Sequence, residues 1–129
     1  MNMQCEDNND IVNLDCDLPV VIDKEKYDNL VSDNFTFISA EIIGDCISIA
    51  IAASGCDGDS WEYQLVDSGA IAETSIPQRD LKFQLINNEI CEAYIVKTIS
   101  FNLKPLQVDG DQEIILNIEG LESPFNYKY

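Results

Sequence analysis

The chain has 129 residues, 46% of them hydrophobic, which suits one domain with a substantial core. It carries 24 Asp and Glu against seven Lys and Arg, a formal net charge of −17, so contact with a nucleic acid or another polyanion would be repulsive. It has no histidine, which excludes imidazole acid–base catalysis, Ser-His and Cys-His nucleophiles and the commonest zinc ligand.

The N-terminal segment, residues 1–15, is predicted to be a disordered acidic tether ahead of a single domain over residues 16–129. Cys5, followed by the polar acidic stretch 6–10, resembles the lipid-modified first residue of a mature bacterial lipoprotein. No apolar leader precedes Cys5, and the alternative is a tail that carries a stray thiol. No stretch approaches about 20 apolar residues, so we expect no transmembrane span and membrane attachment only through a lipid.

The five cysteines indicate an oxidising compartment. They include no CxxC pair, so a structural zinc site is not expected. We predict two disulfides and one odd cysteine, because four of the five lie at strand edges or in polar loops; the alternative is five buried thiols in a cytosolic protein. Spacing alone leaves three pairings of four cysteines open. The cysteines are Cys5, Cys16, Cys46, Cys56 and Cys91.

The domain is predicted to begin with an extended segment and a short helix. Residues 16–22 have an extended pattern, and Asp23 is a candidate N-cap for a helix over residues 24–31. Tyr27, Leu30 and Val31, at positions i, i+3 and i+4, form one apolar stripe of that helix, which we expect to point inward.

From Phe35 onward the apolar residues recur with a period of two, which predicts strands. The first two strands are predicted to form a hairpin around Gly44-Asp45. Residues 67–80 are predicted to be a long connection that crosses between two sheets. In the fifth strand, Lys97 must reach solvent, or a bulge must shift the register, if its apolar neighbours point inward. The predicted strands span residues 35–43, 46–53, 61–66, 81–85, 91–103, 114–118 and 125–129.

About seven short strands, turn signals roughly every ten residues and almost no helix predict an all-β fold. The expected architecture is an antiparallel β-sandwich with one short N-terminal helix. Pro124, at the start of the last strand, is typical of an edge strand.

Two acidic turns are candidate calcium sites, because hard cations prefer several oxygen ligands and alternating Asp side chains supply them. Neither turn has a full EF-hand loop, and Asp-Gly is also an ordinary choice for a hairpin turn. We therefore expect turns and no cofactor, with a calcium-stabilised structural or adhesion domain as an alternative. The candidate ligands are Asp57, Asp59, Asp109 and Asp111.

Aromatic residues are the candidates for ligand binding. Sugar-binding sandwiches stack pyranose rings on flat aromatic faces, so a carbohydrate-binding module is another alternative. Trp61 alternates with polar residues as a core residue does, and core packing is its other interpretation. Arg79, the only arginine, is expected to neutralise a carboxylate. The candidate ligand-binding residues are Trp61, Phe125, Tyr127 and Tyr129.

Several short motifs occur in a characteristic order. They are Ser-Gly-Cys at 54–56, an aromatic-led strand from Trp61, Cys-Glu-Ala at 91–93 and the stretch 100–106, which ends the fifth strand. Together they resemble small envelope proteins of Bacteroidetes-type bacteria, including the C-terminal domains of NigD-like lipoproteins. The resemblance covers roughly residues 35–120.

This resemblance implies an immunoglobulin-like sandwich, often carried behind a lipidated cysteine. It also implies a disulfide between Cys56 and Cys91, which leaves Cys16 to pair with Cys46. The chain departs from the NigD-like pattern, which has Ser-Gly-Gly-Cys and a histidine soon after. One glycine precedes Cys56 here and there is no histidine, so any role of that histidine is absent.

These expectations describe a non-catalytic lipoprotein of the cell envelope, at the outer membrane or cell surface of a Gram-negative bacterium. No pair among the 24 acidic residues is marked as desolvated, so no catalytic residue is assigned. The expected role is a binding or accessory module whose sheet face or edge meets a protein partner, such as an outer-membrane assembly. A glycan is the alternative partner, and nucleic acid is not expected.

Overall fold

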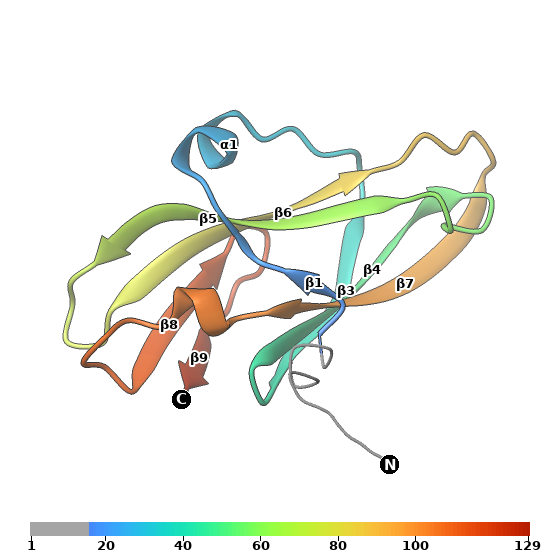
Figure 1. Ribbon diagram of the computed structural model, residues 1–129. Coiled ribbons are helices and arrows are strands. Elements are labelled where there is room, and N and C mark those ends of the chain that lie inside the picture. Colours follow the sequence, from blue (N-terminus) through green and yellow to red (C-terminus); the bar gives the residue numbers. More distant parts are fainter. Residues whose placement is uncertain (1–15) are drawn as a thin grey trace, which may run out of the picture.

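The computed structural model describes residues 16–129, which form two β-sheets packed face to face (Figure 1). The elements are β1 (Leu18–Pro19), β2 (Val21–Ile22), α1 (Lys24–Asn29), β3 (Thr36–Ile43), β4 (Cys46–Gly55), β5 (Glu62–Ala72), β6 (Gln78–Ile86), β7 (Ala93–Asn102), the 3₁₀ helix η3 (Lys104–Leu106), β8 (Glu113–Ile118) and β9 (Phe125–Lys128). Sheet A has the strand order β1-β7-β4-β3, and sheet B has the order β2-β5-β6-β8-β9. The predicted all-β class is confirmed. The predicted tether and Cys5 lie outside the described residues.

The core lies between the sheets because alternate residues of each strand point to the same side. In β4, Ile47, Ile49 and Ile51 have no exposed surface, and their branched side chains suit a pleated surface. Sheet B contributes Leu81 and Leu85 of β6, which are equally buried. Burying each such side chain stabilises the fold by about 1.5–3 kcal/mol relative to leaving it in water.

The expectation of purely antiparallel sheets is wrong, because β1–β7, β2–β5 and β6–β8 are parallel pairs. Residues 18–22 pass from sheet A to sheet B and pair in parallel on both. The connection through η3 carries the chain from β7 in sheet A to β8 in sheet B, where β8 lies parallel to β6. These mixed sheets do not support the immunoglobulin-like assignment. Apolar period identifies strands, whereas strand direction depends on how the connections cross.

The predicted helix forms but is shorter than expected. Asp23 caps it, accepting a hydrogen bond from the backbone N–H of Lys26, and the helix ends at Asn29. Val31 therefore falls outside the helix and is 79% exposed, while Tyr27 is half-buried. None of the helices over residues 16–129 is long and apolar enough to cross a membrane.

The predicted connection over residues 67–80 is wrong. Strands β5 and β6 extend into this region and form an antiparallel hairpin within sheet B. Their register shifts between Asp67 and Ile71, where Gly69 has a φ of 85°, so an irregular strand resembled a loop in the sequence. In β7, Lys97 does reach beyond the core, as required for its neighbours to point inward: its ammonium lies 3.0 Å from a carboxylate oxygen of Asp59.

Both disulfides that the resemblance implied are present. Cys16–Cys46 joins Cα atoms 5.7 Å apart, and Cys56–Cys91 joins Cα atoms 4.8 Å apart, both within the usual range. Strand β4 begins at Cys46 and ends beside Cys56, so the two bridges hold opposite ends of one strand. The first bridge also ties the N-terminal segment to the β3–β4 hairpin.

Candidate functional site

One broad surface is formed by the side chains of β3, β4 and β7 that point away from sheet B, and we call it the outer face. Ala40, Ile49 and Ile99 are register partners on the core side, so their neighbours along each strand point outward. The outer face consists of Thr36, Ser39, Glu41 and Ile43 from β3, Cys46, Ser48, Ala50, Ala52 and Ser54 from β4, and Tyr94, Val96, Thr98, Ser100 and Asn102 from β7.

The outer face consists mostly of small side chains, both hydroxyl-bearing and apolar, and carries almost no charge. Ile43, Tyr94 and Val96 expose 61%, 73% and 49% of their surface. The β4 residues between them are Ser, Ala or Cys, whose short side chains project little above the sheet. Glu41 is its only charged side chain, although 24% of the whole chain is charged. Tyr94 and Val96 lie at one end of the outer face and Ile43 at the other, with short Ser, Ala and Thr side chains between them. Exposed apolar side chains with few charges around them favour contact with another molecule.

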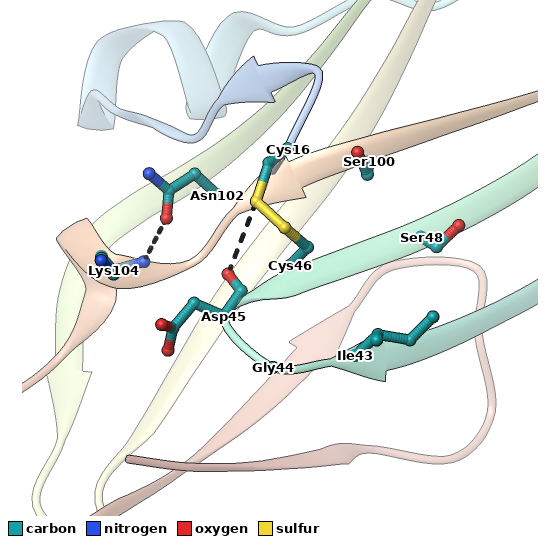
Figure 2. Close-up of a pocket in the computed structure, with 9 residues that line it drawn as sticks. All are labelled: Cys16, Ile43, Gly44, Asp45, Cys46, Ser48, Ser100, Asn102 and Lys104. Atoms are coloured by element: carbon teal, nitrogen blue, oxygen red, sulfur yellow. Dashed lines mark hydrogen bonds between the residues drawn. A yellow bond between two sulfur atoms is a disulfide. The ribbon is translucent and has the colours of Figure 1, made fainter. Parts of the chain in front are cut away.

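A cavity of about 450 Å³ opens at one end of the outer face, beside the Cys16–Cys46 disulfide. Figure 2 shows Ile43, Ser48 and Ser100 at neighbouring positions on β3, β4 and β7, which makes the cavity continuous with the outer face. The lining residues are Cys16, Ile43, Gly44, Asp45, Cys46, Ser48, Ser100, Asn102 and Lys104.

The β3–β4 turn at the cavity is held from behind by β9. The buried hydroxyl of Tyr127 donates to Asp45 at 2.6 Å and accepts from the side-chain amide of Gln107 at 3.0 Å. Burial and the bond to Asp45 raise the pKa of Tyr127 to about 12, so the hydroxyl keeps its proton. The Cys16 sulfur lies 3.9 Å from the Asp45 carbonyl oxygen, a contact only, because a disulfide sulfur carries no proton. The lining therefore combines apolar and hydroxyl groups with one carboxylate, one amide and one ammonium group.

The opposite outer face, that of sheet B, is covered by α1 and the segment after it. The Lys82 ammonium donates to the Tyr27 carbonyl at 3.0 Å and lies 4.4 Å from the centre of the Tyr27 ring. The side-chain amide of Gln84 donates to the Val31 carbonyl at 2.8 Å. Val66, the register partner of Lys82, has no exposed surface.

The two acidic turns predicted as candidate calcium sites lie far apart. Asp57 and Asp59 lie in the loop after β4, whereas Asp109 and Asp111 lie just before β8, at the other end of the sandwich (Figure 1). The Asp57 carboxylate accepts from the backbone N–H of Asp59, whose own carboxylate pairs with Lys97. Within residues 16–129, no group of three Asp, Glu or Cys side chains could hold a metal ion.

The predicted ligand-binding aromatics share no exposed platform. Trp61 is 5% exposed and packs in the core, its alternative interpretation, and Tyr127 has no exposed surface. Phe125 and Tyr129 are half-buried against the core, and the Tyr129 hydroxyl accepts from the backbone N–H of Val108 at 2.9 Å. The rings of Trp61 and Tyr127 therefore have no face on which a sugar can stack.

Arg79 does neutralise a carboxylate, but in the interior. Its Nη1 lies 3.0 Å from Oδ1 of Asp67, and its Nε donates to the Leu106 carbonyl at 2.9 Å. Asp67 has no exposed surface, and this burial raises its pKa despite the cation. The pair therefore fastens β5 and β6 to the η3 connection and is closed to ligands.

Glu89 is a structural residue that sequence reasoning missed. Its carboxylate accepts from the Ser60 hydroxyl at 2.6 Å and from the backbone N–H groups of Cys56 and Gly58 at 2.7 and 3.0 Å. The bond from Ser60, together with those from the amides, lowers the pKa of Glu89 to about 2. The small residues of the loop after β4 were the available signal, since they let successive amides converge on one anion.

Two solved structures share this fold. A NigD-like immunity protein from Bacteroides caccae aligns with a TM-score of 0.62 at 12% identity, over 86% of this chain. A protein of unknown function, DUF1344, from Bacteroides vulgatus aligns with a TM-score of 0.58 at 14% identity, over 88% of this chain. The alignments cover 64% and 57% of those chains, respectively. No family model matches the sequence, and no curated protein does. The expected likeness to NigD-like proteins is therefore supported at the level of the fold, without the immunoglobulin-like assignment.

Proposed function

We propose that this protein is a non-catalytic binding module for a protein partner at the bacterial cell envelope, and that the outer face is its contact surface. The observation that carries the proposal is the combination of Ile43, Tyr94 and Val96 exposed on a sheet face whose one charge is Glu41. Another protein would favourably cover these exposed apolar side chains, and the small neutral residues around them would not oppose its approach.

Location at the envelope has separate support. Two disulfides form readily in oxidising compartments and rarely in a reducing cytosol. The structural neighbours come from Bacteroides species, and the description of one as an immunity protein is compatible with a protein partner. Cys5 is the proposed point of lipid attachment.

The binding role is tested by substituting one exposed valine on each side of the molecule. Val96→Lys places a charge on the outer face, whereas Val31→Lys makes the same change beside sheet B, at a residue that is 79% exposed. We expect one partner protein to co-purify in stoichiometric amount with the wild-type chain from native membranes. Val31→Lys should retain this partner and Val96→Lys should lose it. Equal recovery by both variants, or recovery of the wild type only as a free monomer, would contradict the proposal.

Lipid attachment is tested by detergent phase separation and intact mass. We expect the native chain to enter the detergent phase with the added mass of a lipid, and Cys5→Ser to stay in the aqueous phase. If the native chain partitions like Cys5→Ser, the proposed lipid anchor is wrong, but the proposed binding role is unaffected.

A further inference from the structure

Strand β3 is an edge of sheet A, with β4 on one side. Within residues 16–129 no hydrogen bond joins its other side to the chain. Its start is closed, because the Phe37 ring lies against the turn after β8, only 2.9 Å from where a Cβ at Gly120 would stand. Residues 38–43 therefore form an open strand edge, with a register irregularity at its beginning.

The open edge presents backbone groups at Ala40 and Ile42. The turn Gly44-Asp45 has two residues, so the flanking pair Ile43 and Cys46 is hydrogen bonded, and the pairing alternates along the hairpin. The N–H and C=O groups of Ala40 and Ile42 consequently point away from β4. Both side chains point toward the core and are only half-buried, so this margin of the sandwich is incompletely covered.

On the side of β3, sheet A has one strand fewer than sheet B. Strands β1 and β2 are consecutive and start both sheets on the same side, after which sheet A has three further strands and sheet B has four. Two other edges are better protected: β9 has four residues and ends in Lys128, and the edge of β7 carries Lys97. The residues of β3 include no Lys, Arg or Pro.

We propose that β3 receives an extended segment of the partner as an added strand of sheet A. The segment has apolar residues at alternate positions, which cover Ala40 and Ile42, and a Lys or Arg beside Glu41. Opposite charges on neighbouring strands attract, Glu41 is the only charge on the outer face, and the chain has a net charge of −17, so a basic segment complements it. This inference rests on the proposed binding function and specifies how the partner binds. Backbone hydrogen bonds to β3 supply affinity, and the partner's alternate side chains supply selectivity.

The test uses a synthetic peptide with Val at alternate positions and Lys and Thr between them. With the isotope-labelled full chain, we expect saturating peptide to slow hydrogen exchange at the amides of Ala40 and Ile42 about tenfold. The same peptide N-methylated on the edge-facing residues should have no effect. Binding of the methylated peptide, or no slowing at millimolar peptide, overturns the proposal.

A matched pair of variants tests the edge itself. Ala40→Pro removes the N–H that points away from β4 without removing a bond to β4, and Ala40→Val adds similar bulk but keeps the N–H. We expect Ala40→Pro to weaken peptide binding about tenfold and Ala40→Val to leave it within about twofold. Equal binding by the two variants overturns the proposal. Should Ala40→Pro fail to fold, the methylated peptide gives the same information on the wild-type chain.

A charge exchange locates the contact at Glu41. The wild type should prefer the Lys peptide over a Glu peptide by about threefold, and Glu41→Lys should reverse that preference. Glu73→Lys changes the net charge equally at an exposed residue between β5 and β6, and should keep the wild-type order. A preference that shifts equally in both variants reflects net charge alone and overturns the assignment of Glu41.

Two other occupants would give different results. A dimer in sedimentation that Ala40→Pro abolishes means that a second copy occupies the edge. Protection of the Ala40 and Ile42 amides that disappears when residues 1–15 are removed means that the chain's own N-terminal segment does. Either result overturns the proposal that a partner protein supplies the added strand. The binding role itself fails separately, because it depends on whether Val96→Lys loses the native partner.

Discussion

The two outer faces of the sandwich differ in how far other segments of the chain cover them. On sheet B, α1 and the following segment cover the strands, and Lys82 and Gln84 hydrogen bond to that cover, so that Val66 is fully buried there. On sheet A, residues 16 and 17 lie against only one end of the corresponding surface, at Cys46 and Ser100, and Tyr94 and Val96 remain exposed. A helix and its following segment thus cover sheet B, whereas the outer face of sheet A keeps its large apolar side chains in contact with water.

The two sheets also differ in what stabilises them, which bears on which outer face can bind a partner. Sheet A has both disulfides, one at each end of β4, and sheet B has none among the described residues. Covalent closure can hold a sheet while its outer face stays free for a partner. Sheet B depends instead on its helical cover and on the buried Arg79–Asp67 pair.

The largest expected effect is on sheet A, from removing the bridge at the end of β4. Replacing Cys56 and Cys91 by Ala should lower the free energy of unfolding by about 2–4 kcal/mol, because the bridge closes a loop with a sequence separation of 35 residues. Denaturant unfolding measures it, and Cys5→Ala is the matched control, with no expected change. A loss below about 1 kcal/mol would mean that the surrounding hydrogen bonds hold this end unaided.

The next effect concerns Glu89, which fixes the same end without covalent bonds. Its pKa is about 2 in the folded chain and near 4.5 when unfolded, so its stabilisation is complete above pH 4.5 and disappears as the pH falls toward 2. Glu89→Gln should lower Tm at pH 7, by less than loss of the disulfide. Thermal unfolding should show the two chains converging at pH 2. A constant Tm difference across this range would show that shape, and not charge, explains the effect.

A smaller effect is expected on sheet B, where Asp23 begins the helix that covers it. Asp23→Ala removes the hydrogen bond to the Lys26 amide and should cost about 1 kcal/mol in the free energy of unfolding. Asp28→Ala, which removes only an exposed pair with Lys24, is the control and should cost less than half as much. Equal losses in denaturant unfolding would mean that the cap does not hold the cover in place.

The sequence predicted the pieces of this structure better than their arrangement. Period-two patterns located β4 and β8, and Asp23 was identified as a helix cap, because these depend on neighbouring residues. The parallel pairs could not be predicted, since they depend on where connections cross between sheets. The β5–β6 hairpin was missed because its irregular register around Gly69 resembles a loop.

The candidate site was less predictable than the fold. A sheet face or edge was expected to bind a protein, but without naming which one. The aromatics expected for the alternative, glycan binding, are partly buried, and the burial of Trp61 and Tyr127 depends on which strands face each other, which no local pattern reports. The outer face is defined by cross-strand neighbours such as Ser48 and Ser100, which are far apart in the chain. Glu89 was missed for the same reason: its partners come from a loop about 30 residues away.

The smallest expected effect on stability comes from Val96→Lys, which tests whether the outer face of sheet A serves binding and not stability. Val96→Lys should change the free energy of unfolding by no more than about 0.5 kcal/mol, because the side chain is 49% exposed and a long ammonium can extend into water. Loss of the native partner without loss of stability would assign Val96 to binding alone. A cost above about 1 kcal/mol in denaturant unfolding would instead show that the outer face supports the fold, and its apolar residues would then need no partner to explain them.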